Sequence, residues 1–433
     1  MKKIAIAAIA TLGLASVAQA AGPADVDASF YPYKAGVPTH PVAKPGAVID
    51  ASNVDQAKDV LDEASYMAIK SGWATFKVGP TTSFELSPPY VDATKKNFAS
   101  VKLGAKEGEN LVGYVAGRPF PEEPSASDPR AGEKLGWNFK YGINWGDSAA
   151  ISPFYWTYRN MNSGSVERVL KMSMHFLNFM HRTATDPKPN IEPNPTGMYR
   201  SIYVKVLEPQ DVADTQLLIH RFEDDTQLDS AWLYLGFQRR VRKLSTGQIT
   251  DAFLGSDLMI EDIEGYNGRN SDMHWNYKGT RNILMPYYAH NDMELATEYA
   301  EPNYKYIAFE GKGNCFPKIT YQLRKVYEVE VVPVDPNHPI SKRIMYFDAQ
   351  TMGASRSVNY DRSGKLWKTF VIGKSLPDFH LPINKGSGIA IDDSFMMLDL
   401  QSQHCTTGQF KGQVDPSLSP PQRFNVDGLR SGN

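Results

Sequence analysis

The chain has 433 residues, two cysteines and a formal net charge of −2 at pH 7. This near-neutral balance gives no whole-chain field that would favour DNA or anionic lipid, so we expect no nucleic-acid partner. The length fits one large domain or two closely packed ones, and the 22 Tyr and 7 Trp favour an all-β or α+β interior.

The first 20 residues have the pattern of a Sec-type export signal. Lys2 and Lys3 precede an apolar run from Ile4 to Val17, and Ala18-Gln19-Ala20 has the small-x-small pattern that signal peptidase accepts. The alternative is a short buried N-terminal helix. Because the apolar run is too short to span a bilayer and no cysteine follows it, we expect cleavage after Ala20, a periplasmic location and no lipid anchor.

The next segments predict an arm and two helices. Residues 21–50 hold many Pro, Gly and Ala and predict an extended arm, whereas residues 52–72 predict a helix capped by Ser52. Turn formers at 118–132 predict a loop. Residues 165–182 predict a second helix, whose apolar positions share one side: Val166, Val169, Leu170, Met174, Leu177 and Met180.

From Tyr199 onward the apolar period changes to two, which predicts strands. Short connections, such as the hairpin turn at 361–364, predict an antiparallel meander whose apolar face must curl or be covered. The last 30 residues are rich in Pro, Ser and Gly and predict a loose tail. The expected strands span 199–207, 215–222, 231–244, 258–264, 274–277, 318–334, 344–348, 352–360 and 365–372.

Cys315 and Cys405 are an isolated pair of cysteines, which usually forms a disulfide in an oxidising compartment. Closing the loop between them would stabilise the fold by ~4.6 kcal/mol in the chain-entropy model. The alternatives are two unrelated thiols or a Cys-His metal site at His404 and Cys405. No second pair with ligand spacing stands near those two residues, which disfavours metal.

Catalytic signatures are mostly absent from the sequence. No Gly-x-Ser-x-Gly elbow, His-Glu-x-x-His pair or phosphate-binding loop occurs. Tyr66 and Lys70 have the spacing of a short-chain dehydrogenase, but no dinucleotide-binding unit precedes them. Met and His residues at 172–181 could bind copper or could form a Met-rich packing face, which we favour. We therefore expect no catalytic residues, no cofactor and no metal site.

Residues 229–266 are denser in charged and aromatic side chains than the rest. Trp232 and Tyr234 share one face of a predicted strand that leads into a basic cluster, and an acidic segment follows at 257–264. The two charged segments could pair across strands, which is worth little in solvent, or the basic cluster could hold a lipid headgroup or a partner protein. The basic cluster consists of Arg239, Arg240, Arg242 and Lys243.

The same region carries a resemblance to known proteins. Trp232–Leu235, Arg239–Leu244 and Phe253–Asp257 resemble the signature of the LolA/LolB-like superfamily of outer-membrane lipoprotein-sorting proteins. The whole of residues 50–375 resembles a periplasmic family of unknown function with that fold, although the N-terminal arm lacks the family's Gly- and Trp-rich segment. Further stretches of similarity lie at 117–121, 128–132, 137–138, 327–330, 341–348 and 364–367.

The resemblance implies an α+β fold in which a strongly curved antiparallel sheet forms an unclosed β-barrel and helices cover its concave side. It divides the chain into a signal peptide at 1–20, the arm at 21–50, a LolA/LolB-like domain at 51–375 and a C-terminal extension at 376–433 held by the disulfide. It also implies a periplasmic carrier or chaperone for a lipid or other hydrophobic molecule. Such a carrier would work with an RND-type inner-membrane transporter and an outer-membrane partner.

A carrier of this kind needs an apolar pocket with a few polar groups at its mouth. Burying an acyl chain with about 14 methylenes yields ~11 kcal/mol gross, and association costs of ~4–15 kcal/mol offset much of it. Plain core packing is the alternative role for every pocket residue. The pocket candidates are Trp232, Tyr234, Met259, Trp275, Tyr346 and Trp367 from the sheet, with Met174, Leu177 and Met180 from the second predicted helix.

Two other functions remain open at this point. An adaptor without a ligand would use the basic cluster as its docking surface. An enzyme acting on lipid or on an envelope polymer would depend on carboxylates such as Asp257, Glu261 and Asp262, whose geometry nothing in the sequence fixes. We expect the protein not to be an enzyme.

Overall fold

The computed structural model describes residues 22–245, 250–288, 294–299, 301, 303–379 and 381–431. The expected export signal at 1–20 lies outside the described residues, so its cleavage stays a prediction. None of the described helices has the length and apolar character needed to cross a membrane.

Strands hold far more of the described chain than helices do, and the helices are short. The helices are α1 (Pro23–Phe30), α2 (Glu63–Lys70), α3 (Pro88–Asn97), α4 (Ala131–Lys140) and α5 (Gly428–Ser431). The strands of the first half are β1 (Val48–Ile49), β2 (Phe76–Gly79), β3 (Ser148–Asn160), β4 (Val166–Asn178), β5 (Met198–Glu208), β6 (Gln216–Phe222), β7 (Ser230–Leu235) and β8 (Arg240–Lys243). Those of the second half are β9 (Met273–Met285), β10 (Tyr287–Tyr288), β11 (Phe309–Glu310), β12 (Phe316–Pro317), β13 (Thr320–Pro333), β14 (Ile340–Asp348), β15 (Arg356–Asp361), β16 (Leu366–Ser375), β17 (Ile391–Asp399) and β18 (His404–Gln413).

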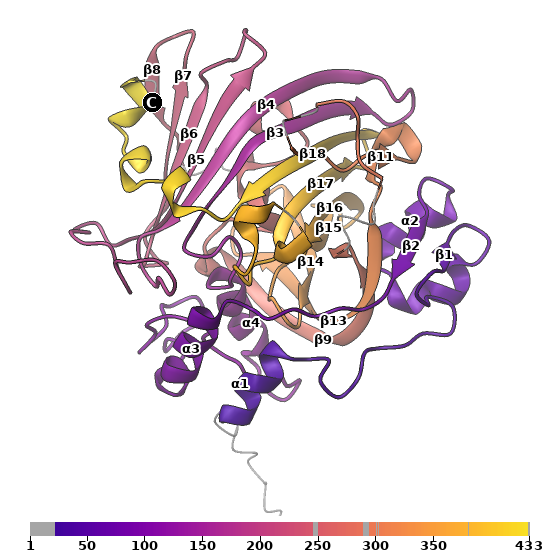
Figure 1. Ribbon diagram of the computed structural model, residues 1–433, viewed down its shortest axis with the longest axis horizontal. Helices are drawn as coiled ribbons and strands as arrows, with labels where there is room; N and C mark the ends of the chain where they lie inside the picture. Colours follow the sequence, from indigo (N-terminus) through magenta and orange to yellow (C-terminus); the bar gives the residue numbers. More distant parts are fainter. Residues whose placement is uncertain are drawn as a thin grey trace, which may run out of the picture.

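One large curved sheet organises the molecule (Figure 1). Its strand order is β1-β2-β13-β14-β15-β16-β17-β18-β3-β4-β5-β6-β7-β8, with β9 beside β13 and β10 beside β16. The path ends at β1 and β8 without closing, which confirms the strongly curved, unclosed sheet expected from the sequence. The sheet is mixed, because β2 pairs with β13 and β10 with β16 in parallel, whereas the other neighbours are antiparallel.

The predicted second helix at 165–182 is wrong, because this segment contains strand β4. β4 pairs with β3 on one side and β5 on the other. From Met172 to Leu177 successive residues are buried, so both faces of the sheet are covered there. This apolar run satisfies a helical and a strand period at once, and pairing decides between them. The side chains that join the core cluster are Leu170, Met172, Met174 and Phe176.

The first predicted helix, at 52–72, is divided in two. A 3-10 turn covers Val54–Val60, and α2 begins after Asp62. The carboxylate of Asp62 accepts a hydrogen bond from the Ser65 backbone N–H at 2.9 Å, which caps α2 and starts a new helix. The arm expected at 21–50 contains α1 and is otherwise irregular before β1.

The sheet also extends beyond the expected boundary at residue 375. β17 and β18 lie in the sheet between β16 and β3, so part of the expected C-terminal extension is central to the fold. β18 begins at His404 and occupies the start of the segment expected to be a loose tail, whose Pro and Ser residues come after it. Two further expectations change: 231–244 is the hairpin β7–β8, and 258–264 forms 3-10 turns.

The concave face of the sheet is filled by the protein's own chain. We call residues 253–267, which form 3-10 turns between β8 and β9, the plug. Arg200 of β5 forms an ion pair with Glu264 of the plug at 3.0 Å, and Lys368 of β16 donates to the Asp257 carbonyl at 2.6 Å. Since β17, β18, β3 and β4 separate these two strands, the sheet must curl around the plug to reach it from both sides.

Helices contribute less to this covering than expected. α4 packs on β9 in the same cluster as Tyr266 of the plug. Gly136 of α4 allows close approach, because a Cβ there would lie 2.8 Å from the Trp275 ring. The expected helical cover is therefore mostly irregular chain, with α4 at one end.

The disulfide between Cys315 and Cys405 is confirmed. Both residues are fully buried, and the bond joins the segment before β12 to strand β18. It therefore ties a loop to the middle of the sheet across a sequence separation of 90 residues.

We expect the double variant Cys315→Ala, Cys405→Ala to lose about 4.6 kcal/mol of unfolding free energy, because the unfolded chain regains the entropy of an open loop. Urea unfolding followed by circular dichroism measures this loss. Wild-type protein unfolded in reductant is the control and should approach the variant. Equal stability of the oxidised wild type and the variant would contradict the expectation.

Candidate ligand-binding site

A cavity of about 540 Å³ lies where the sheet fails to close. We call it the open-side cavity. It is bounded by β6 and β7 on one side, by the ends of β9 and β13 on the other, and by the plug. Its volume falls within the range of about 300–1,000 Å³ that is usual for small-molecule sites. Its apolar lining consists of Ile219, Leu228, Ala231, Leu244, Ile260, Met273, Pro333 and Val334.

The apolar floor follows from strand alternation. Ile219 and Ala231 are register partners on β6 and β7, and both belong to the core cluster on the concave face. The Leu244 N–H donates to the Ala231 carbonyl at 2.8 Å, which continues the same face beyond β8. At the rim, Leu228 and Val334 are 52% and 51% exposed. Apolar side chains facing water around a cavity offer surface that a hydrophobic ligand would cover.

A buried ionic network forms one wall of this cavity. The Arg343 guanidinium pairs with the carboxylates of both Glu261 and Asp262, the latter at 3.0 Å. His338 Nε2 lies 2.9 Å from Glu261 Oε1. Burial by itself would raise the pKa of Glu261, but Arg343 and His338 outweigh it and hold this pKa at about 2. Glu261 is thus a fixed anion that anchors the plug to β14.

Two more carboxylates on the lining also have cationic partners. Asp229 lies 3.2 Å from the Arg221 guanidinium, and Arg269 Nε donates to Asp272 at 3.0 Å. Burial raises the pKa of Asp229 in spite of Arg221. Asp229 and Asp272 are therefore already engaged by cations, and the described lining holds one further carboxylate, the exposed Asp335, which accepts from the Asn337 N–H at 2.8 Å.

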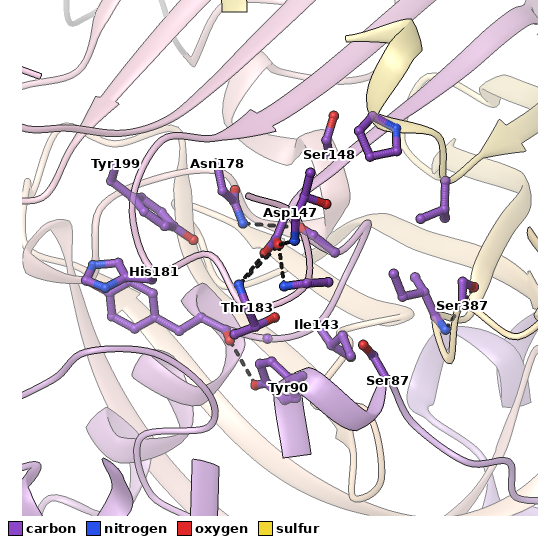
Figure 2. Close-up of a pocket in the computed structure, with 18 of the residues that line it drawn as sticks. Ser87, Tyr90, Ile143, Asp147, Ser148, Asn178, His181, Thr183, Tyr199 and Ser387 are labelled. Carbon is purple, nitrogen blue, oxygen red and sulfur yellow. Dashed lines mark hydrogen bonds between the residues drawn. The ribbon is translucent and has the colours of Figure 1, made fainter. Parts of the chain in front are cut away.

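A second pocket, of about 230 Å³, opens between α3, the end of α4 and the start of β3 (Figure 2). Figure 2 shows Asp147 bonded to the loop at Thr183, with Tyr199 and His181 to one side and Ser87 to the other. Asp147 accepts hydrogen bonds from three successive backbone N–H groups at 2.7–3.1 Å. This pocket is smaller and is lined by many hydroxyl groups, so it suits an acyl chain less well than the open-side cavity.

The middle of the concave core is nearly full. The space left there measures only about 30 Å³, between β3, β4, β16 and the plug. That is about the room of one water molecule. A hydrophobic ligand in the present conformation therefore has room beside the plug and not beneath it.

The structure does not bring the expected pocket residues together. Trp232, Tyr234 and Leu177 share the outer face of the sheet, under the C-terminal segment with Phe424. Among the nine, Met174 alone reaches the small core void, and none lines the open-side cavity within the described part of the chain.

The remaining expected residues are scattered. Met259 is buried within the plug, and Trp275 packs beside α4. Tyr346 lies in a separate cluster with Val326 and Ala64. The Trp367 ring donates to Asp399 at 2.9 Å, and Met180 is half-buried after β4.

Sequence reasoning missed the lining of the open-side cavity for a physical reason. Leu228 stands in a loop among polar residues, where no period marks it, and Val334 is the last residue of a predicted strand, just beyond the end of β13. Ile219 belongs to a strand that was predicted, yet alternation could not tell which of its faces is concave. Across the described residues, no group of three or more His, Cys, Asp or Glu side chains is placed to hold a metal ion.

We expect Arg343→Met to cost about 3–5 kcal/mol of unfolding free energy, because it leaves Glu261 and Asp262 buried without their cation. Thermal and urea unfolding measure the loss. Arg281→Met is the matched control: its ion pair with Glu328 is partly exposed, so it should cost at most about 1 kcal/mol. Similar losses in the two variants would contradict a special role for the buried network.

We also expect Glu261 to make the free energy of unfolding depend on pH in the acidic range. Its pKa is about 2 in the folded protein and 4.5 ordinarily, so between these values the unfolded chain binds more protons. Its contribution is present above pH 4.5 and is lost as the pH falls toward 2. Urea unfolding across this range should therefore vary less with pH for Glu261→Gln than for wild type. The exposed Glu192→Gln control should follow the wild type, and an unchanged profile for Glu261→Gln would be contrary evidence.

Comparison with known proteins gives one family match. A family model described as "Protein of unknown function (DUF1329)" matches residues 48–430. This confirms the resemblance to a family of unknown function that the sequence indicates. No curated protein matches the chain.

Several solved structures are similar to this one. A Vibrio parahaemolyticus domain, whose description relates it to outer-membrane lipoprotein sorting, is 17% identical with a TM-score of 0.48, covering 70% of this chain and 100% of that one. A DUF1329 family protein from Desulfovibrio piger is 17% identical with a TM-score of 0.46, covering 70% and 99%. A LolA superfamily protein from Nitrosomonas europaea is 13% identical with a TM-score of 0.37, covering 65% and 91%.

Proposed function

The chain belongs to the DUF1329 family, and we propose that it is a carrier or chaperone that binds a hydrophobic or amphipathic small molecule in the open-side cavity. The observation that carries this proposal is the cavity itself. It combines a volume of about 540 Å³, a buried apolar floor and two half-exposed apolar side chains at its rim, Leu228 and Val334.

The energetics suit loading and unloading. Each buried methylene contributes about 0.8 kcal/mol, so a chain of about 14 methylenes gains about 11 kcal/mol gross, and association costs of about 4–15 kcal/mol offset much of this gain. The ionic wall at Glu261 and His338 lies on one side of this floor and can orient a polar end of the ligand. A carrier needs such moderate affinity, since it must also release its cargo.

The proposed setting is the periplasm, with an RND-type inner-membrane transporter and an outer-membrane protein as partners. The export-signal pattern at residues 1–20 supports it, and so does the buried disulfide, since such bonds persist in oxidising compartments. A catalytic role is less well supported, because Asp229, Glu261 and Asp272 are each engaged by an arginine and have structural partners.

The test is mass spectrometry of solvent extracts from the mature protein, purified from periplasm without detergent. We expect a hydrophobic compound at about one equivalent per chain, because the cavity would otherwise leave apolar surface in water. Leu228→Asp and Val334→Asp should each reduce the bound amount roughly tenfold, since a carboxylate would face the ligand's hydrocarbon. Both positions are about half exposed, so folding should tolerate the change.

Val112→Asp is the matched control, because Val112 is 59% exposed and lies outside the lining of the cavity. It should keep the ligand. Two outcomes would contradict the carrier proposal and favour an adaptor without a ligand. One is a folded wild-type protein that carries no ligand, and the other is an equal loss of ligand in all three variants.

A further inference from the structure

The β7–β8 hairpin projects from the free end of the sheet (Figure 1). Its tip runs from Gly236 to Arg239, and the Phe237 side chain there is 69% exposed. Phe237 packs in none of the apolar clusters of the described chain. A phenyl ring held in water at a hairpin tip gains free energy from any surface that removes it from solvent.

Four cations follow this ring along the hairpin. Arg239, Arg240, Arg242 and Lys243 are all exposed, and within the described residues none of them forms an ion pair. Arg242 bonds to the Gln238 side chain at 2.9 Å, and Lys243 lies 5.5 Å from the Trp232 ring centre. The basic cluster expected from the sequence therefore carries uncompensated positive charge on both faces of the hairpin, with Arg240 and Arg242 on one face of β8 and Lys243 on the other.

Neighbouring carboxylates do not neutralise this patch. The turn between β5 and β6 approaches the tip, since a Cβ on Gly236 would lie 2.9 Å from Asp214. Asp214 pairs with Lys205 at 3.2 Å, and Asp211 of the same turn pairs with Arg168 at 2.5 Å. These carboxylates are engaged by cations of β4 and β5, so the hairpin keeps its charge.

The strand register connects the patch to the open-side cavity. Arg242 is opposite Leu233, and Arg240 is opposite Leu235. Two residues further from the tip, Leu244 bonds to Ala231, and both line the cavity. By alternation, Arg240 and Arg242 lie on the same face as that lining. The hairpin is thus an outward continuation of the cavity wall.

We propose that the β7–β8 hairpin docks the protein on an anionic lipid bilayer, with Phe237 inserted at headgroup level and the four cations on lipid phosphates. An aromatic ring bordered by long cationic side chains is the chemistry that membrane interfaces select. A stable protein interface instead requires a patch of about 1,000 Å² or more with a core depleted in charge, which a single ring among four cations does not provide.

Docking would bring the cavity wall to the lipid surface. Loading from that surface rests on the proposed carrier function, whereas docking itself needs only the hairpin. Vesicle binding and bound-ligand content therefore report on the two proposals separately.

The experiment is co-sedimentation of the full mature chain with phosphatidylcholine vesicles, with and without phosphatidylglycerol. We expect binding only to the anionic vesicles, weakening as salt rises. Arg240→Gln with Arg242→Gln should weaken it roughly 10- to 30-fold, and Phe237→Ser roughly tenfold or more. All three side chains are exposed, so the fold should persist, as circular dichroism can verify.

Two controls match these changes. Lys102→Gln with Lys106→Gln removes two exposed cations between α3 and α4, and Val112→Ser removes an exposed apolar side chain there. Both should bind like wild type. Docking is overturned if wild type ignores anionic vesicles, if the hairpin variants bind as well as the controls, or if the hairpin instead crosslinks to an envelope protein without lipid. In each of these cases the carrier proposal would still stand if the Phe237→Ser variant bound as much ligand as the wild type.

Discussion

The pairing of buried charges on the plug is the interaction on which the rest of this structure depends. Glu261 and Asp262 share the Arg343 guanidinium of β14, while Asp257 lies 2.8 Å from His404 of β18. Buried carboxylates are costly unless a cation and hydrogen bonds satisfy them, so each contact fixes the plug at one place along the sheet. These contacts come from strands that are far apart in the sheet order. The apolar side chains on the inner faces of those strands pack against the plug, and the sheet therefore curves around it.

That arrangement also decides where a ligand has room. An unfilled curved sheet would offer its concave centre, but the plug leaves only about 30 Å³ there. The larger space lies at the edge that does not close, where β7 and the ends of β9 and β13 are not joined by backbone hydrogen bonds. The same ionic network that stabilises the plug forms one wall of this space, so the stability of the fold and the shape of the site depend on the same residues.

The free end of the sheet joins the two surfaces to which we assign function. β7 contributes Ala231 to the open-side cavity, and with β8 it carries Phe237 and the cationic patch away from the core. An edge hairpin with several Arg and Lys residues also resists pairing with other strands, because its charges repel one another. The position of the hairpin at the end of the strand order is what leaves it free to meet a surface.

Sequence alone determined the elements whose signal is local: most of the strands between Met198 and Ser375 from a period of two, the disulfide from an isolated pair of cysteines, and the family from the motif around Trp232. It did not determine β4, because a run buried on both faces suits a helix equally well until strand partners exist. Nor could alternation say that Trp232 and Tyr234 face outward, since it tells which residues share a face and not which face is concave. The open-side cavity was decided by tertiary structure, because its lining comes from segments distant in sequence that meet only after the sheet has curled around the plug.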